Sequence, residues 1–185
     1  MRRNWVIAVA ATLLAAGCGD GAAPSDAPSA APSPAARLTV TSTAYADGAS
    51  VPRRYTCDGA DVSPPLAVTG VPAGTASLAL VLRDADAAHG TFAHWLVWNI
   101  GPHTTRLSAG ERPQGAAEGR NGFGKTGYGG PCPPRGDRPH RYVLTVYAVD
   151  RRVPLAAGAS GGELLRALSG HTLGMGVLTG RYGRA

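Results

Sequence analysis

The stretch GYGGPCPPRGDRPHRYVLTVYAVD, residues 127–150, joins a loop of glycine and proline to a run of alternating apolar residues. The second half has the composition and the alternation of a β-strand. Because side chains alternate along a strand, His140 and Tyr142 share one face at its beginning and Arg141 points to the other. The pattern fits two interpretations: a rigid rim around a small anion-binding pocket, or an ordinary loop that enters a strand.

Three further segments predict strands. Residues 37–45 alternate apolar and polar side chains, and residues 77–84 and 91–100 are denser in apolar residues, as central strands are. Residues 106–131 are rich in glycine and have no periodicity, which predicts a long loop of a kind that is often functional.

Helices are predicted only at the C-terminus. Residues 160–169 have Ser160 as an N-cap and Glu163 as its partner three residues on, followed by an apolar face. Residues 171–178 predict a short second helix that Gly174 and Gly176 weaken. Strands followed by helices predict a mainly β fold, chiefly antiparallel, with short peripheral C-terminal helices.

Polar residues fall on apolar faces of these strands. In residues 78–84, one strand face consists of leucines and has Asp84 as its last residue. In the next strand, His94 shares a face with Phe92, Leu96, Trp98 and Ile100. The link over residues 85–90 is short enough for a hairpin, which would bring Asp84 and His94 close together.

Buried polar groups need partners. One interpretation is that they satisfy one another, Asp84 with a histidine and Asp86 with Arg141. The other is a site, because two histidines, an aspartate and a tyrosine converge at strand ends beside a glycine-rich loop. Histidine and tyrosine donors together with free backbone N–H groups suit a phosphate or a carboxylate.

The N-terminus predicts export. Two arginines precede a short uncharged, apolar run, too short to span a bilayer, and LAAGC places small residues before Cys18. We expect residues 1–17 to be a lipoprotein signal peptide with Cys18 as the lipidation site; a plain secretory signal is the alternative. Residues 18–36, rich in Ala, Pro and Ser, predict a disordered tether, and residues 37–185 a single domain.

The charge and the cysteines narrow the function further. The formal net charge is +6, but the arginines are scattered and form no cluster with interleaved aromatic residues, so we expect no nucleic-acid partner. In an oxidising compartment Cys57 and Cys132 either form a disulfide or stay two separate buried thiols.

Two blocks carry a family resemblance. DADAAHGTFAHWLVWNI, residues 84–100, resembles the first motif of the phosphatidylethanolamine-binding proteins, and the stretch from 127 to 150 resembles their second motif. Residues 55–72 and the C-terminal tail are similar to the bacterial Raf-kinase-inhibitor-like branch of that family. The chain is therefore identified as a member of this branch, in the form of an exported lipoprotein.

The resemblance implies a β-sandwich in which a large antiparallel sheet packs on a smaller one, with an anion pocket at one end. Carried over by position, the ligand-binding residues are Asp84, His94, His140 and Tyr142, and the loop from 129 to 133 forms part of the wall. Within that loop, Gly130 and Pro131 are expected to contribute to the site.

The sequence and the resemblance lead us to expect a binding protein and no enzyme. The pocket would take a small anion or a phospholipid head group, on a domain lipid-anchored to the extracytoplasmic face of a bacterial membrane. The alternative is an interaction protein that inhibits or modulates a protease or another extracytoplasmic partner through the 106–131 loop. We expect no catalytic residue, no metal and no cofactor; a protein partner and a homodimer are left open.

Overall fold

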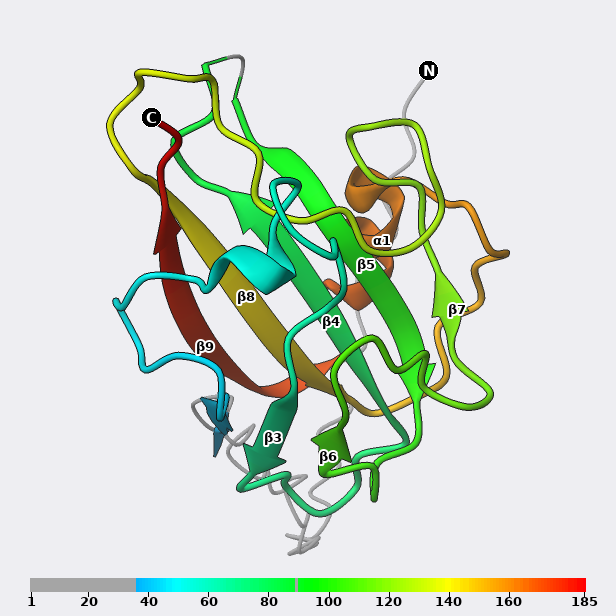
Figure 1. The fold of residues 1–185 in the computed structure, drawn as a ribbon. Helices are drawn as coiled ribbons and strands as arrows, with labels where there is room; N and C mark the ends of the chain where they lie inside the picture. The colour runs from blue at the N-terminus through cyan, green and yellow to red at the C-terminus, as the bar shows by residue number, and fades with distance from the viewer. Residues whose placement is uncertain (1–35, 89) are drawn as a thin grey trace, which may run out of the picture. The chain divides into compact units, whose positions relative to one another are not determined.

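The predicted strands over residues 77–84, 91–100 and 141–150 form the centre of a six-stranded sheet in the computed structural model, which describes residues 36–88 and 90–185 (Figure 1). The predicted strand over residues 37–45 is instead divided between two short strands that belong to two different sheets. β1 pairs with β9 in parallel, and the other neighbours are antiparallel. The strand order across the sheet is β1 (Ala36–Arg37), β9 (Thr172–Tyr182), β8 (His140–Val149), β4 (Ser77–Asp84), β5 (Phe92–Ile100) and β7 (Ala117–Glu118).

A smaller antiparallel sheet covers one face of the large one, as the predicted fold class requires. It consists of β2 (Thr39–Thr41), β3 (Leu66–Thr69) and β6 (Arg106–Leu107), with a 3-10 helix, η1 (Arg53–Tyr55), between β2 and β3. The main hydrophobic core lies between the two sheets, where Leu80 and Leu144 of the large sheet pack with Val40 and Val68 of the small one. Burial of these apolar side chains is the principal force that holds the sandwich together.

The helix α1 (Gly161–Leu168) packs on the opposite face of the large sheet (Figure 1). Its N-terminus has the predicted capping box, since Ser160 Oγ accepts from the Glu163 backbone N–H and the Glu163 carboxylate accepts from the Ser160 backbone N–H. Leu164 and Leu168 are buried in a second apolar cluster, whereas Leu165 remains 41% exposed.

The second predicted helix, over residues 171–178, is wrong, because these residues belong to the long strand β9. Gly174 and Gly176 weaken a helix, but in the strand they allow close packing. A Cβ atom at Gly174 would lie 2.5 Å from the Ala36 carbonyl oxygen, and one at Gly176 would lie 2.4 Å from that of Leu38. The glycines therefore let the N-terminal segment cross β9 at close range.

The predicted faces of β5 also need a correction. The register with β4 shifts between Leu82 and Arg83, which leaves His94 as an extra residue in a β-bulge. His94 and Trp95 then both lie on the side of the main core, whereas Leu96 and Trp98 pack on the side of α1. A strict alternation had placed His94, Leu96 and Trp98 together.

The predicted signal peptide, Cys18 and the tether up to residue 35 lie outside the described residues. β1 begins at Ala36, one residue before the expected start of the domain. Within the described part of the chain, no helix has both the length and the apolar composition that crossing a membrane requires.

Candidate functional site

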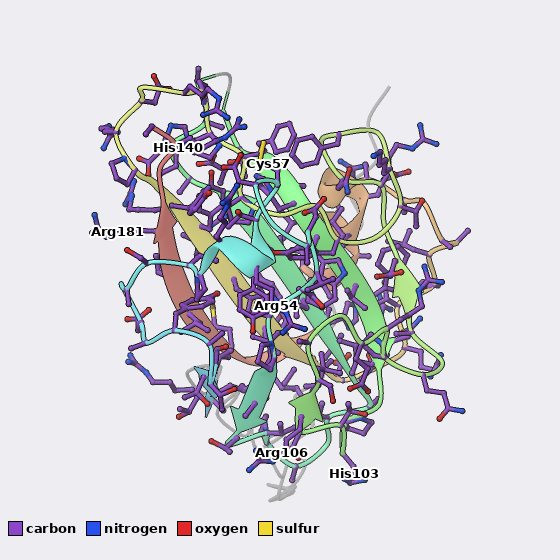
Figure 2. The ribbon with its side chains drawn as sticks, in the orientation of Figure 1. Arg54, Cys57, His103, Arg106, His140 and Arg181 are labelled. Atoms are coloured by element: carbon purple, nitrogen blue, oxygen red, sulfur yellow. A yellow bond between two sulfur atoms is a disulfide. The ribbon has the colours of Figure 1, made fainter. Side chains whose placement is uncertain are left out.

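A cavity of about 380 Å³ lies where β4 ends and where β5 and β8 begin. Asp84 is paired in register with Phe92 on one side and with Tyr142 on the other. Because these strands are antiparallel, the end of β4 meets the beginnings of both neighbours, and polar residues from three segments converge. Figure 2 shows His140 at the same end of the molecule as Cys57, with His103 and Arg106 at the other.

Asp84 and His140 form a buried pair on the cavity wall. Asp84 Oδ2 accepts a hydrogen bond of 2.7 Å from His140 Nδ1, and both side chains are less than 9% exposed. The carboxylate thereby fixes the proton on Nδ1. The other ring nitrogen, Nε2, lies 3.7 Å from Asp137 Oδ2, and Asp137 also lines the cavity.

His94 enters the cavity from the bulge of β5. Its Nδ1 lies 2.8 Å from the Gly129 carbonyl oxygen, so Nδ1 carries the hydrogen and donates it. Burial lowers the pKa of His94, with the neighbouring carbonyl and Asp84 opposing that shift. With its hydrogen on Nδ1, neutral His94 has a lone pair on Nε2 that can accept a hydrogen bond from a ligand.

Tyr142 lies behind these histidines and does not line the cavity. Its ring packs edge-on against His94 with 5.2 Å between centroids, and its side chain is 1% exposed. The hydroxyl has no hydrogen-bond partner among the described residues, and burial raises its pKa far above the ordinary value. Within this structure Tyr142 supports His94 by packing.

An aromatic lip borders the cavity. The rings of Phe92, His94 and Phe123 contact one another, with centroids 4.8–5.4 Å apart, and Phe123 is 45% exposed. Phe123 and Asp137 were not predicted as site residues. The signal available for Phe123 was an aromatic residue within a glycine-rich loop, and Tyr128 of the same loop gives the same signal.

The loop that follows Gly129 forms one wall, partly through residues of the predicted range 129–133 but not through Gly130 or Pro131. Cys132, Pro133 and Pro134 line the cavity, whereas Gly130 and Pro131 lie behind them. The Gly130 N–H donates to Asp61 Oδ1 at 2.7 Å, and the Pro131 carbonyl accepts from the Cys57 N–H. The Gly130 amide is therefore already occupied and does not face a ligand.

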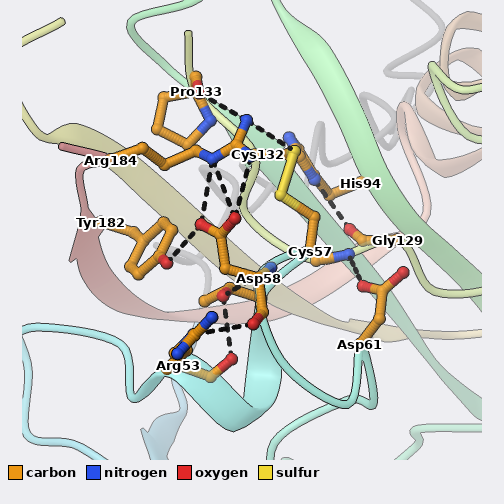
Figure 3. Close-up of a disulfide and its surroundings, with 12 residues drawn as sticks. Arg53, Cys57, Asp58, Asp61, His94, Gly129, Cys132, Pro133, Tyr182 and Arg184 are labelled. Atoms are coloured by element: carbon orange, nitrogen blue, oxygen red, sulfur yellow. Dashed lines mark hydrogen bonds and ion pairs between the residues drawn. A yellow bond between two sulfur atoms is a disulfide. The ribbon is translucent and has the colours of Figure 1, made fainter. Parts of the chain in front are cut away.

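A disulfide between Cys57 and Cys132 fastens this wall to the segment after η1 (Figure 3). This is one of the two states that the sequence left open. Beside it, Asp58 accepts hydrogen bonds from Arg184 and from the Tyr182 hydroxyl. Arg184 holds the pKa of Asp58 below its usual value. The C-terminal tail is thereby tied to the same wall.

Asp86 pairs with Arg141, as the structural interpretation of these residues predicted. Asp86 accepts from Arg141 Nε at 2.9 Å and from its backbone N–H at 2.8 Å, and Arg138 lies 3.2 Å away. These bonds hold the pKa of Asp86 well below its usual value. Asp86 lines the cavity but its charge is already balanced.

The electrostatics of the cavity are unusual for an anion site. Among the residues that the structure describes, three carboxylates line it, and no lysine or arginine does. Asp84 is engaged by His140 and Asp86 by two arginines, which leaves Asp137, whose side chain is 52% exposed, as the carboxylate open to a ligand. Among the described residues, no cluster of three or more His, Cys, Asp or Glu side chains is arranged to hold a metal ion.

Comparisons with known proteins agree with this architecture. A family model described as phosphatidylethanolamine-binding protein matches residues 41–183. A UPF0098 protein of Pyrococcus horikoshii is 42% identical over 150 residues, which cover 77% of this chain and 75% of that protein. A Mycobacterium tuberculosis protein named "Putative lipoprotein LppC" is 39% identical, over 78% of this chain and 72% of its own.

A solved structure has the same fold. The E. coli protein YbcL, described as a new member of the mammalian PEBP family, superposes with a TM-score of 0.76 at 32% identity. The match covers 80% of this chain and 99% of that one.

Proposed function

Because the chain belongs to the phosphatidylethanolamine-binding protein family, we propose that its cavity binds a small phosphate- or carboxylate-bearing ligand, with a zwitterionic head group such as phosphoethanolamine as the preferred form. The observation that carries this proposal is the buried Asp84–His140 pair, which faces neutral His94 and the open carboxylate of Asp137 within one cavity.

Each group has a role in this proposal. His140, whose Nδ1 is held by Asp84, presents Nε2 to the phosphate group. His94 accepts from a protonated phosphate oxygen, a group that phosphate monoesters retain near pH 6. The ammonium group of the ligand pairs with Asp137, which explains why a carboxylate faces an anion site. The apolar lip of Phe92 and Phe123 covers the carbon atoms next to the head group.

Binding can be tested by titrating the purified protein with phosphoethanolamine, inorganic phosphate, ethanolamine and acetate, while the imidazole signals of His94 and His140 are followed by NMR. We expect saturable shifts of both histidines, with phosphoethanolamine binding more tightly than either of its halves. His140→Ala should weaken binding more than tenfold without changing the circular dichroism spectrum. Absence of any shift at millimolar ligand would refute the proposal.

A matched control exists in the same chain. His171 Nδ1 lies 3.0 Å from Asp150 Oδ1 in a second histidine–aspartate pair, which is partly exposed and remote from the cavity wall. His171→Ala should leave the affinity for phosphoethanolamine unchanged. Equal losses in both variants would show that the effect is not specific to the cavity.

We also propose that Cys18 anchors the domain to the extracytoplasmic face of a bacterial membrane. The sequence around Cys18 and the relative that bears a lipoprotein name support this. Cys18→Ser should move the protein from the membrane fraction to the soluble fraction. The absence of catalysis remains a prediction, and a protein partner for the 106–131 segment and a homodimer are still open.

A further inference from the structure

A second cavity, of about 360 Å³, lies on the other face of the large sheet, beside α1. Successive residues of β4 alternate, so Arg83 points away from the side of Asp84 and toward this second cavity. Thr91 and Phe92 line both cavities, so the beginning of β5 forms the partition between them. The volume is within the range of small-molecule sites, about 300–1,000 Å³.

The charge of this cavity is opposite to that of the first. Arg83 and Arg120 line it, and no carboxylate of the described part of the chain does. Neither arginine side chain takes part in the ion pairs or side-chain hydrogen bonds of the described chain, which use other arginines. Glu163, at the start of α1, does not line the cavity, and its carboxylate accepts from the Ser160 backbone N–H and hydroxyl.

Two uncharged polar side chains, Thr91 and Asn121, also line this cavity. The Asn121 amide donates to the Gly127 carbonyl, and its oxygen accepts from the backbone N–H groups of Phe123 and Lys125. The two guanidinium groups are therefore the free hydrogen-bond donors with charge, and a planar guanidinium binds a carboxylate or a phosphate through paired N–H groups.

Apart from Thr91, the rest of the described lining has no polar side chain. Val81 and Leu96 are buried in the cluster below α1 and form the floor. Leu165 lines the cavity from α1 and is 41% exposed, although its neighbours Leu164 and Leu168 are buried. Gly161 has no side chain to fill the space above Leu96; a Cβ atom there would come within 3.7 Å of that leucine.

We propose that this second cavity binds an amphipathic anion, a carboxylate or phosphate on a short hydrocarbon chain. Arg83 and Arg120 hold the anionic group, and the chain lies on Val81, Leu96 and Leu165. This site is separate from the head-group cavity, and the proposal does not depend on what that cavity binds. In this proposal a single ligand contacts both Arg83 and Arg120 and the exposed side chain of Leu165.

The test is a titration of the purified protein with octanoate and with octyl phosphate, measured by calorimetry and by the methyl signals of Leu165. We expect saturable binding of both compounds and at least tenfold weaker binding of acetate, inorganic phosphate and octanol, which each lack one half of the ligand. Arg83→Gln and Arg120→Gln should each weaken octanoate binding about tenfold, the loss of one charge-assisted contact. Wild-type affinity in both variants would overturn the proposal.

Two controls separate this site from its surroundings. Arg181→Gln removes an exposed arginine of β9 that does not line the cavity, and it should leave the affinity unchanged. His140→Ala should weaken phosphoethanolamine binding but not octanoate binding. If octanoate binding is lost in His140→Ala and kept in Arg83→Gln, the amphipathic anion binds in the first cavity and the proposal is wrong.

The anion could be free or part of a bilayer, and vesicles distinguish the two sources. Vesicles of phosphatidylcholine that contain phosphatidic acid should displace octanoate if the ligand is a membrane lipid, and should not do so if it is a free acyl anion. In both cases the proposal requires that Arg83→Gln and Arg120→Gln weaken binding.

Discussion

His140 Nδ1 lies 2.7 Å from Asp84 Oδ2, and this contact links residues 56 positions apart in the sequence at the mouth of a cavity. Neither side chain is free to reorient, because both are buried at the ends of adjacent strands. The pair therefore presents one fixed nitrogen, Nε2, to the cavity.

Asp84→Asn should remove the charge that supports His140 while keeping the shape of the side chain. We expect at least a tenfold loss of phosphoethanolamine affinity and a stability loss of about 1–3 kcal/mol, since a buried hydrogen-bonded charge is replaced. Titration calorimetry and urea unfolding measure the two effects. Asp150→Asn, in the exposed pair with His171, should change neither; unchanged affinity in Asp84→Asn would argue against the role of the pair.

Asp86→Asn should change the acid sensitivity of the fold. The hydrogen bonds from Arg141 lower the pKa of Asp86 in the folded state below its value in an unfolded chain, about 3.9. The stability that Asp86 contributes is therefore complete above that value and is lost as the pH falls below it. We expect the variant to be less stable than wild type at pH 7 and to lose less stability between pH 5 and pH 2.

The measurement is the free energy of unfolding by urea at a series of pH values. Asp58, whose pKa Arg184 lowers, keeps its own share of the acid sensitivity in the variant, so the slope should be reduced and not abolished. Parallel curves for the two proteins would show that the Asp86–Arg141 pair does not contribute to pH-dependent stability.

The regular strands made part of the site predictable. β4 and β8 pair in a continuous register without a bulge. The alternation of side chains along each strand therefore placed Asp84, His140 and Tyr142 on the correct faces. The same reasoning misplaced Leu96 and Trp98 because the bulge at His94 depends on how β5 pairs with β4. A register shift is a property of two strands, and one strand's pattern does not contain it.

The features that the sequence did not predict have a common physical cause. Each depends on contacts between residues that are far apart in the sequence. The glycines of β9 are unfavourable for a helix and for an isolated strand, and their use becomes visible only when Leu38 packs on them. Phe123 and Asp137 lie in loops without periodicity, where no pattern indicates which side chain turns toward the cavity. The second cavity likewise required α1 and β4 to be brought together.

Removal of the disulfide should destabilise the fold and loosen the cavity wall. Cys57 and Cys132 are 75 residues apart, and a loop of that length corresponds to about 4 kcal/mol of lost chain entropy in the unfolded state. We expect a reductant, or the double variant Cys57→Ser/Cys132→Ser, to lower the melting temperature and to weaken phosphoethanolamine binding, because Cys132 lines the cavity.

Alkylation of the unreduced protein followed by peptide mapping provides the check on pairing. Neither Cys57 nor Cys132 should be labelled before reduction. Labelling of both, together with a melting temperature that does not respond to a reductant, would contradict the bond.

Gly176→Ala should destabilise the protein although it adds a single methyl group. That group would lie 2.4 Å from the Leu38 carbonyl oxygen, which belongs to the backbone and cannot rotate away. The N-terminal segment must therefore shift from β9, and we expect a loss of about 1–3 kcal/mol in urea unfolding.

Gly162→Ala is the matched control for this substitution. A Cβ atom there meets only Arg166 Nη1, at an ordinary distance of 3.5 Å, and alanine favours the helix by up to about 1 kcal/mol. Gly162→Ala should therefore be neutral or stabilising, whereas Gly176→Ala should lose stability. Equal stability of the two variants would show that the crossing of Leu38 over β9 does not require a glycine at position 176. The glycines of β9 would then need another explanation.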